Sequence, residues 1–196
     1  MTKVARNRIG AFVLVALGAV ACGDLRSNVG DAQPSPDFAQ GQKEWKAPPI
    51  GAVEVSSASE ATRHLAFTPR EPNGLGKASK IYAQNSGPES ERQFRGLVWV
   101  FETDQYGVIR LSMELDTLTA DQRASSNAQA VARSNDPNQQ GRGRAEFVTI
   151  RGGTQALLGF PPDGSGNISW REGPILIVVA GPALTREQAI AIAEKL

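Results

Sequence analysis

The sequence is short of the residues on which most metal and catalytic sites depend, because its 196 residues include one cysteine and one histidine. A single cysteine excludes an intramolecular disulfide. His64 has no second histidine to share a metal ion with, so the chain lacks the donor set of a typical zinc site. We therefore expect no metal and no cofactor. We interpret His64 as a surface residue of a short helix, and a catalytic base is the alternative.

Nucleotide-binding loops and a basic surplus are also missing. The pair Gly152-Gly153 lacks the spacing of a phosphate-binding or dinucleotide-binding loop. Three of the 21 basic residues precede Cys22, and the remaining 18 are set against 20 acidic residues, a net charge of −2. Proteins that bind nucleic acid usually carry a basic face. We therefore expect no nucleic-acid partner.

No apolar run is long enough to span a bilayer, but a shorter one follows the basic start of the chain. Residues 9–20 form an apolar or small run of 12 residues, whereas a membrane-spanning helix needs about 20. Lys3, Arg6 and Arg8 precede this run, and Ala21 and Cys22 follow it. A basic start, an apolar stretch and small residues at a cut are typical of an export signal.

The four residues from Ala19 to Cys22 (AVAC) resemble the lipobox of bacterial lipoproteins, with Ala19 in place of the usual leucine. The resemblance implies a signal peptide of residues 1–21, cleavage after Ala21 and lipidation of the Cys22 thiol. It also implies membrane lipid as a partner, and a domain in the cell envelope, outside the cytoplasm. Two or more acyl chains hold a protein stably, since each buried methylene contributes about 0.8 kcal/mol. The alternative is an ordinary secretory signal with Cys22 as a stray thiol.

The remaining chain divides into a polar segment and one domain. Residues 22–49 contain Gly, Asp, Asn, Ser, Gln and Pro with almost no apolar periodicity. This composition is typical of a flexible tether, in which Phe38 and Trp45 are candidates for local docking. Residues 50–196 have the length and composition of a single globular domain, which the export signal implies is extracytoplasmic.

The apolar periodicity of residues 50–196 predicts mostly strands. Predicted strands cover residues 50–55, 80–84, 97–101, 108–115, 146–151, 155–158, 168–171 and 174–180, and predicted helices cover 58–65, 117–133 and 186–196. Residues 97–101 and 175–180 are apolar on both faces, which favours central positions in a sheet. Short turns favour antiparallel pairing. The predicted class is therefore α+β, a mostly antiparallel sheet with a C-terminal helix and a short N-terminal helix packed on it.

Two short patterns predict where helices begin. Ser57 with Glu60, and Thr185 with Gln188, have the spacing of a capping box. The apolar residues of the last helix form one stripe, which predicts that Ile190 or Ile192 covers the sheet. We expect Trp170, Ile177 and Val179 to be buried beneath it.

The stretch from Asn167 to Leu196 resembles the end of an uncharacterised family of bacterial extracytoplasmic domains. The likeness rests on Trp170 in one strand, the turn Glu172-Gly173, a second apolar strand and a helix ending in Ala193-Glu194-Lys195-Leu196. Upstream, residues 65–69 resemble the opening of the same family. Such domains occur alone, or at the C-terminus of anti-sigma factors and of proteins related to lipoprotein carriers. The family implies no catalytic residue, and its matching positions are interpreted as structural.

Several loops remain as candidates for binding. Residues 163–167 (DGSGN) look faintly like a calcium loop, but the acids needed later in that motif are missing, so a turn is the better interpretation. Gly141-Arg142-Gly143-Arg144 has two arginines that could bind an anion or a lipid headgroup, but a solvated loop is the better interpretation. The long polar loops 87–92 and 134–144 are typical places for binding.

The sequence therefore predicts a non-enzymatic envelope module that binds a partner or acts as a sensor. The alternative is a carrier of lipid or another hydrophobic ligand. A third candidate is an envelope hydrolase, which would need His64 beside acids and a serine.

Overall fold

The computed structural model describes residues 43–85, 94–136, 138 and 143–196. The strands are β1 (Ala52–Glu54), β2 (Lys80–Asn85), β3 (Phe94–Thr103), β4 (Gly107–Leu115), β5 (Arg144–Ile150), β6 (Thr154–Phe160), β7 (Gly166–Glu172) and β8 (Ile175–Gly181). The helices are α2 (Ala58–Thr62), α3 (Ala120–Ser134) and α4 (Arg186–Lys195).

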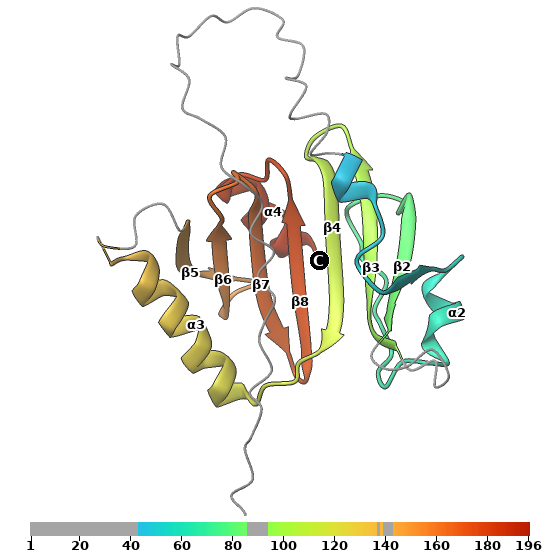
Figure 1. Cartoon of the computed structure of the whole chain (residues 1–196), viewed down its shortest axis with the longest axis horizontal. Helices are drawn as coiled ribbons and strands as arrows, with labels where there is room; N and C mark the ends of the chain where they lie inside the picture. Colours follow the sequence, from blue (N-terminus) through green and yellow to red (C-terminus); the bar gives the residue numbers. More distant parts are fainter. Residues whose placement is uncertain (1–42, 86–93, 137, 139–142) are drawn as a thin grey trace, which may run out of the picture. The chain divides into compact units, whose positions relative to one another are not determined.

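All eight strands belong to one antiparallel sheet, in the order β1-β2-β3-β4-β8-β7-β6-β5 (Figure 1). The predicted class, α+β with a mostly antiparallel sheet, is confirmed. Each half of the sheet is a meander of four consecutive strands, and α3 lies between the halves in the sequence. The two halves join where β4 pairs with β8, from Arg110 opposite Ala180 to Leu115 opposite Ile175. The two strands predicted to be central, β3 and β8, are both interior.

One side of the sheet, called face A here, carries the main apolar core. Its buried side chains are Leu97, Trp99 and Phe101 of β3, Ile109, Leu111 and Met113 of β4, Ile168 and Trp170 of β7, and Ile177 and Val179 of β8. The helix α4 covers β7 and β8 through Ala189, Ile192 and Ala193, which are fully buried. The burial predicted for Trp170, Ile177 and Val179 is therefore confirmed, and Ile192 is the isoleucine that covers them.

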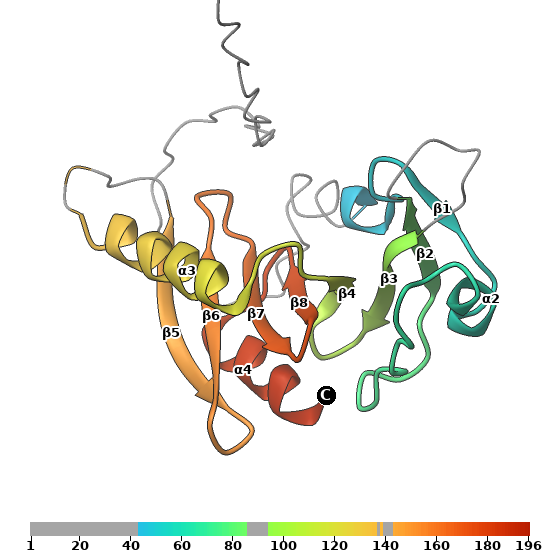
Figure 2. The same ribbon diagram turned by 90° about the horizontal axis from the view of Figure 1, so that it is seen from below.

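The first half of face A is covered by α2 and by the chain that follows it. Ala58 and Ala61 of α2 and Leu75 are buried in the same core, and Leu65, Phe67 and Ala78 pack against it. Ala156 and Leu158 of β6 and Ile150 of β5 complete the core at the other end. Helices and irregular chain therefore fill face A along both halves of the sheet (Figure 2).

The opposite side, called face B here, has a smaller apolar cluster on β2–β4. Tyr82, Val98, Val100 and Val108 are buried there, with Trp45 and Ala52 packed against them. The alternation predicted for β4 is present, because Ile109 and Leu111 point into face A while Arg110 and Ser112 are half-buried on face B. Figure 2 shows α3 on the side of the sheet away from α4.

The helix starts follow the capping patterns, with one difference. Thr185 and Gln188 form the complete capping box at α4. At α2 only half of the box forms, because Ser57 accepts from the Glu60 N–H while the Glu60 carboxylate accepts from the N–H and hydroxyl of Ser56. The turn predicted at Glu172-Gly173 is present, and Gly173 has a φ of 59°, a conformation in which glycine is the least strained residue.

Candidate functional site

Residues 43–49, called the strap here, are the first described part of the chain, and they pack on face B. Residues 43–46 are helical, and the Trp45 side chain packs against the cluster of Tyr82 and the three valines. The sequence assigned these residues to the tether and named Trp45 as a candidate for local docking. In the structure this last part of the assigned tether is held on the sheet, while residues 22–42, which include Phe38 and Cys22, lie outside the described residues.

Arg110 of β4 holds the strap by its main chain. Its Nε donates to the carbonyl of Trp45 at 2.6 Å, and its Nη2 donates to the carbonyls of Glu44 at 3.0 Å and Ala47 at 2.5 Å. The guanidinium also lies 5.4 Å from the centre of the Trp45 ring. Burial lowers the pKa of Arg110, because desolvation disfavours its charged form. The three carbonyl oxygens and the aromatic ring therefore replace the water that the cation has lost.

Two further contacts fix the strap. The Tyr82 hydroxyl donates to the carbonyl of Lys46 at 3.1 Å, and Lys46 Nζ lies 2.5 Å from a carboxylate oxygen of Glu102. Both partners of this ion pair are more than two-fifths exposed, and such surface pairs contribute little. The hydrogen bonds of Arg110 and Tyr82 and the packing of Trp45 are therefore the main interactions of the strap.

The middle of face B, between the strap and α3, is not fully covered. Ser112 of β4, Val178 and Ala180 of β8, and Asn167 and Ser169 of β7 are all half-buried there. This strip mixes small, apolar and polar side chains on rigid central strands. Surfaces of this composition suit contact with another molecule, because little conformational entropy is lost when short side chains are covered.

The helix α3 crosses the far end of face B and is held by polar contacts. None of its side chains is buried. Arg123 donates two hydrogen bonds, at 2.9 and 2.6 Å, to the carboxylate of Asp116, whose side chain has no exposed surface. Arg171 of β7 approaches the same carboxylate at 3.7 Å. At the other end of α3, the Ser134 hydroxyl donates to the carbonyl of Ala145.

The electrostatics of this contact favour the ionised carboxylate. The hydrogen bonds from Arg123, the N–H of Leu118 and the nearby charges of Arg123 and Arg171 lower the pKa of Asp116, although burial opposes them. In return, Asp116 raises the pKa of Arg123. The pair of Arg123 and Asp116 is therefore the main charged contact between α3 and the sheet.

A second cluster ties α4 to the strands of face A. Arg151, in the β5–β6 turn, donates from its N–H to the Glu194 carboxylate at 2.9 Å, from Nε to the carbonyl of Ala193, and from Nη1 to Glu172. Its guanidinium lies 5.1 Å from the centre of the Trp170 ring, and the indole N–H donates to Glu172 at 2.9 Å. Three residues on which the family resemblance rests, Trp170, Glu172 and Glu194, thus meet at Arg151, which the sequence analysis did not single out.

His64 lies just after α2, not within it, because the helix ends at Thr62. The imidazole is exposed and meets the Phe94 ring edge to face, with 5.6 Å between ring centres. The main-chain carbonyl of His64 accepts a hydrogen bond from the N–H of Phe94. No side-chain hydrogen bond or ion pair joins His64 to another of the described residues. The interpretation of His64 as a surface residue agrees with this placement.

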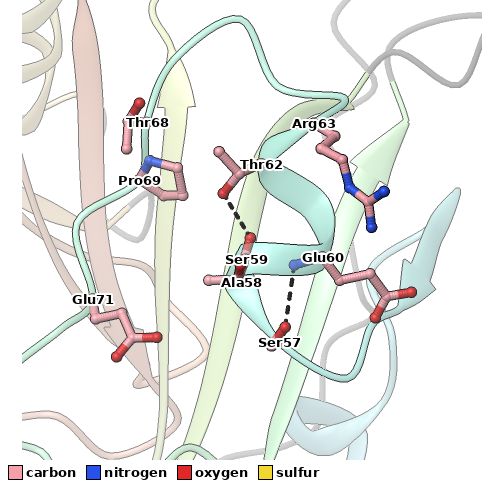
Figure 3. A pocket seen from close by; sticks show the side chains of 9 residues that line it. All are labelled: Ser57, Ala58, Ser59, Glu60, Thr62, Arg63, Thr68, Pro69 and Glu71. Atoms are coloured by element: carbon pink, nitrogen blue, oxygen red, sulfur yellow. Dashed lines mark hydrogen bonds between the residues drawn. The ribbon is translucent and has the colours of Figure 1, made fainter.

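An open hollow of about 740 Å³ lies beside α2 (Figure 3). Its lining consists of Ser57, Ala58, Ser59, Glu60, Thr62, Arg63, Thr68, Pro69 and Glu71. In Figure 3 Glu60, on α2, and Glu71, on the chain that follows Pro69, lie on opposite sides of the view. Ser57 and Thr62 are used in helix hydrogen bonds, and His64 is not part of the lining. The hollow does not bring the histidine, an acid and a serine together.

The remaining candidates from the sequence are placed as follows. Asp163 accepts from the N–H and hydroxyl of Ser165, so residues 163–167 begin with a closed turn. The loop 87–92 lies outside the described residues, as do positions 137 and 139–142 of the loop 134–144, which include Gly141 and Arg142.

Within the described ranges there is no group of three or more His, Cys, Asp or Glu side chains that could hold a metal. The same ranges contain no helix long and apolar enough to cross a membrane.

No protein-family model and no curated protein matches the chain. Among solved structures, it is similar to a GTP binding regulator from Thermotoga maritima, with 16% sequence identity and a TM-score of 0.38. The likeness covers 76% of this chain and 93% of the other. A likeness at this level carries no argument about function. The resemblance to an extracytoplasmic family therefore stays a prediction.

Proposed function

We propose that the protein is a lipid-anchored lipoprotein of the bacterial cell envelope, whose domain acts by binding, as a partner-binding or sensory module, and not by catalysis. Membrane lipid would hold it through acylated Cys22. The sequence from Lys3 to Cys22 supports the anchor. The structure contributes one observation, the contrast between the two faces of the sheet: face A is filled by α2 and α4, whereas face B keeps a half-buried strip on its central strands.

The charged groups support binding over catalysis. The most strongly engaged ones, Arg110, Asp116, Arg123 and Arg151, each have a structural partner: the strap, α3 or α4. Enzymes place titratable groups where burial and neighbours tune them toward a reaction. Here the hydrogen bonds and opposite charges of Asp116 and Arg123 stabilise their charged forms against the effect of burial, which suits the docking of a helix.

The anchor is tested by changing Cys22 to Ser in the full chain and fractionating the cells. We expect the variant to leave the membrane fraction or to remain as uncut precursor, because the thiol that accepts the lipid is gone. The matched control is Ser134→Ala, which keeps Cys22 and should remain in the membrane fraction. A Cys22→Ser protein that is still cut and still extracted only by detergent would refute the anchor.

The binding role is tested separately with His64→Ala. We expect this variant to restore the wild-type phenotype to a strain that lacks the protein, because the imidazole is exposed and only packs against Phe94. Circular dichroism should first show that the variant is folded. Loss of the phenotype in a folded and correctly anchored His64→Ala protein would contradict a binding role and favour a hydrolase.

A further inference from the structure

The contacts between the strap and the sheet resemble those between a bound peptide and its binding site. Four consecutive carbonyl oxygens, from residues 44–47, accept hydrogen bonds from side chains of the sheet, namely Arg110 and Tyr82. The Ala47 N–H also donates to the Glu44 carbonyl, which closes a helical turn. Carbonyl groups at the end of such a turn carry partial negative charge and attract a cation. Arg110 therefore recognises the main chain at the end of a helical turn.

The side-chain part of this recognition is one aromatic ring. Trp45 packs on Tyr82, Val98, Val100 and Val108 and against the Arg110 guanidinium. Lys46 adds only an exposed ion pair with Glu102. Because the hydrogen bonds go to the main chain, they place no demand on the identity of the other side chains. Any segment with an aromatic residue on a helical turn meets the same requirements.

The site is complete on the folded domain. Its donors and apolar residues come from β2, β3 and β4, which also carry the buried core of face A on their other side. Arg110 forms no salt bridge with any acid among the described residues, so nothing else on the sheet neutralises its charge. Without the strap, a cation and four apolar side chains would face the solvent together.

Occupation by the strap does not require a strong interaction. Only residues 50 and 51 separate the strap from β1, and a connection this short gives an effective concentration in the millimolar range or above. A segment that binds with a dissociation constant near a millimolar would therefore already be seated in its own chain. A segment from another protein with micromolar affinity would compete with it.

We propose that face B of β2–β4 is a peptide-binding site, seated here with the chain's own residues 43–47, that accepts a partner protein segment bearing an aromatic residue on a helical turn. The proposal rests on the binding role proposed above and adds to it a ligand and a second site on face B, next to the half-buried strip. The strap then serves as a built-in competitor. A partner must displace it, which sets a threshold for the partner's concentration or affinity.

The test uses the full chain and a labelled synthetic peptide spanning residues 41–49, followed by fluorescence anisotropy. In the Trp45→Ala chain the strap loses its ring, so we expect saturable binding of the peptide. The unaltered chain should bind the peptide at least about ten-fold more weakly than the Trp45→Ala chain, because its own strap competes. A peptide with Ala in place of the tryptophan should not bind.

Arg110→Met in the Trp45→Ala background should abolish peptide binding. The matched control, Arg144→Met, removes an exposed arginine at the edge strand β5 and should leave binding unchanged. Absence of saturable binding to folded Trp45→Ala chain, or equal binding with and without Arg110, would overturn the proposal. Concentration-dependent dimers of the unaltered chain that disappear in Trp45→Ala would also overturn it, since the occupant would then be a second copy.

A second measurement is independent of the Trp45→Ala chain. With Arg110→Met as the sole change, we expect the tryptophan emission to shift to longer wavelength, because Trp45 loses its cover while Trp99 and Trp170 stay 2% exposed. An unchanged emission in this variant would contradict the role of Arg110. Fractionation of Cys22→Ser does not involve Arg110, so failure of the peptide site and failure of the proposed anchor are distinguishable.

Discussion

The attachment of α3 makes a quantitative prediction about Arg123. This helix has fifteen residues and buries none of them, so apolar packing contributes little to its place on the sheet. Its main polar attachment is the pair of hydrogen bonds from Arg123 to the buried carboxylate of Asp116. Replacing Arg123 with Ala removes both bonds and leaves the carboxylate without its closest cation.

The expected cost follows from the geometry. Breaking a buried ion pair by removing one partner typically costs about 3–5 kcal/mol. Here the value is lower, because the Arg123 side chain keeps 25% exposure, and because Arg171 and the Leu118 N–H still face the carboxylate. We expect Arg123→Ala to lower the free energy of unfolding by about 2 kcal/mol, within the range for hydrogen bonds to charged groups.

Chemical denaturation measures this difference, with Arg133→Ala as the matched control. Arg133 lies in the last turn of the same helix, is exposed, and forms no ion pair with another described residue. Its replacement should change the free energy of unfolding by less than about 0.5 kcal/mol. Hydrogen exchange of the unaltered protein should also show α3 amides exchanging before those of α4, which buries three residues. Equal losses in the two variants, or equal protection of the two helices, would refute this account of α3.

Three further predictions follow from the same structure. The lowered pKa of Asp116 stabilises the fold above the pKa of about 3.9 of an unfolded aspartate, and this contribution is lost as the pH falls through the folded value. When the free energy of unfolding is measured by denaturation at pH 5 and at more acidic pH, Asp116→Asn should therefore lose less stability than the unaltered protein. Equal losses in the two proteins would argue against this contribution of Asp116. Ile192→Ala should cost about 2–5 kcal/mol, because this side chain of α4 is fully buried against the sheet, whereas Glu187→Ala on the exposed side of the same helix should be nearly neutral. Deletion of Arg186–Leu196 should abolish the cooperative thermal transition, and a transition at an unchanged temperature would show that α4 is dispensable.

The strands and the last helix could be predicted because their signals are local. The alternation along β4 separates Ile109 and Leu111 from Arg110 and Ser112 without any knowledge of their neighbours. The pattern at Thr185 and Gln188 places the start of α4 for the same reason, since both partners of the capping box lie within one turn. The start of α3 had an equally local signal, Thr119 with Gln122, which forms a complete capping box and was overlooked.

The charged clusters could not be predicted, because their partners are distant in the sequence. Arg110 meets carbonyls more than sixty residues earlier, and Arg151 meets a carboxylate more than forty residues later. The strap posed a related problem, since its composition is that of a tether, and Trp45 is the one large apolar side chain with which it packs on the sheet. Arg110 did carry a weak signal, as the one arginine within an otherwise regular strand. Its role depends on the pairing that brings β2, β3 and β4 together around one apolar cluster, which the local sequence does not show.

The pairing of β4 with β8 has a consequence for how the chain reaches this structure during synthesis. Leu111 is opposite Val179, so the seam at the centre of the sheet closes only after about seventy further residues have been made. Until then β4 is an edge strand with unpaired main-chain groups and an apolar face, and such edges are prone to join with other chains. Pairings between residues this far apart also form slowly, because the intervening loop must be closed first. The sheet is thus completed only when β8 has been made, and α4 then covers it. A nascent chain shorter than about 181 residues exposes this edge and is prone to aggregation.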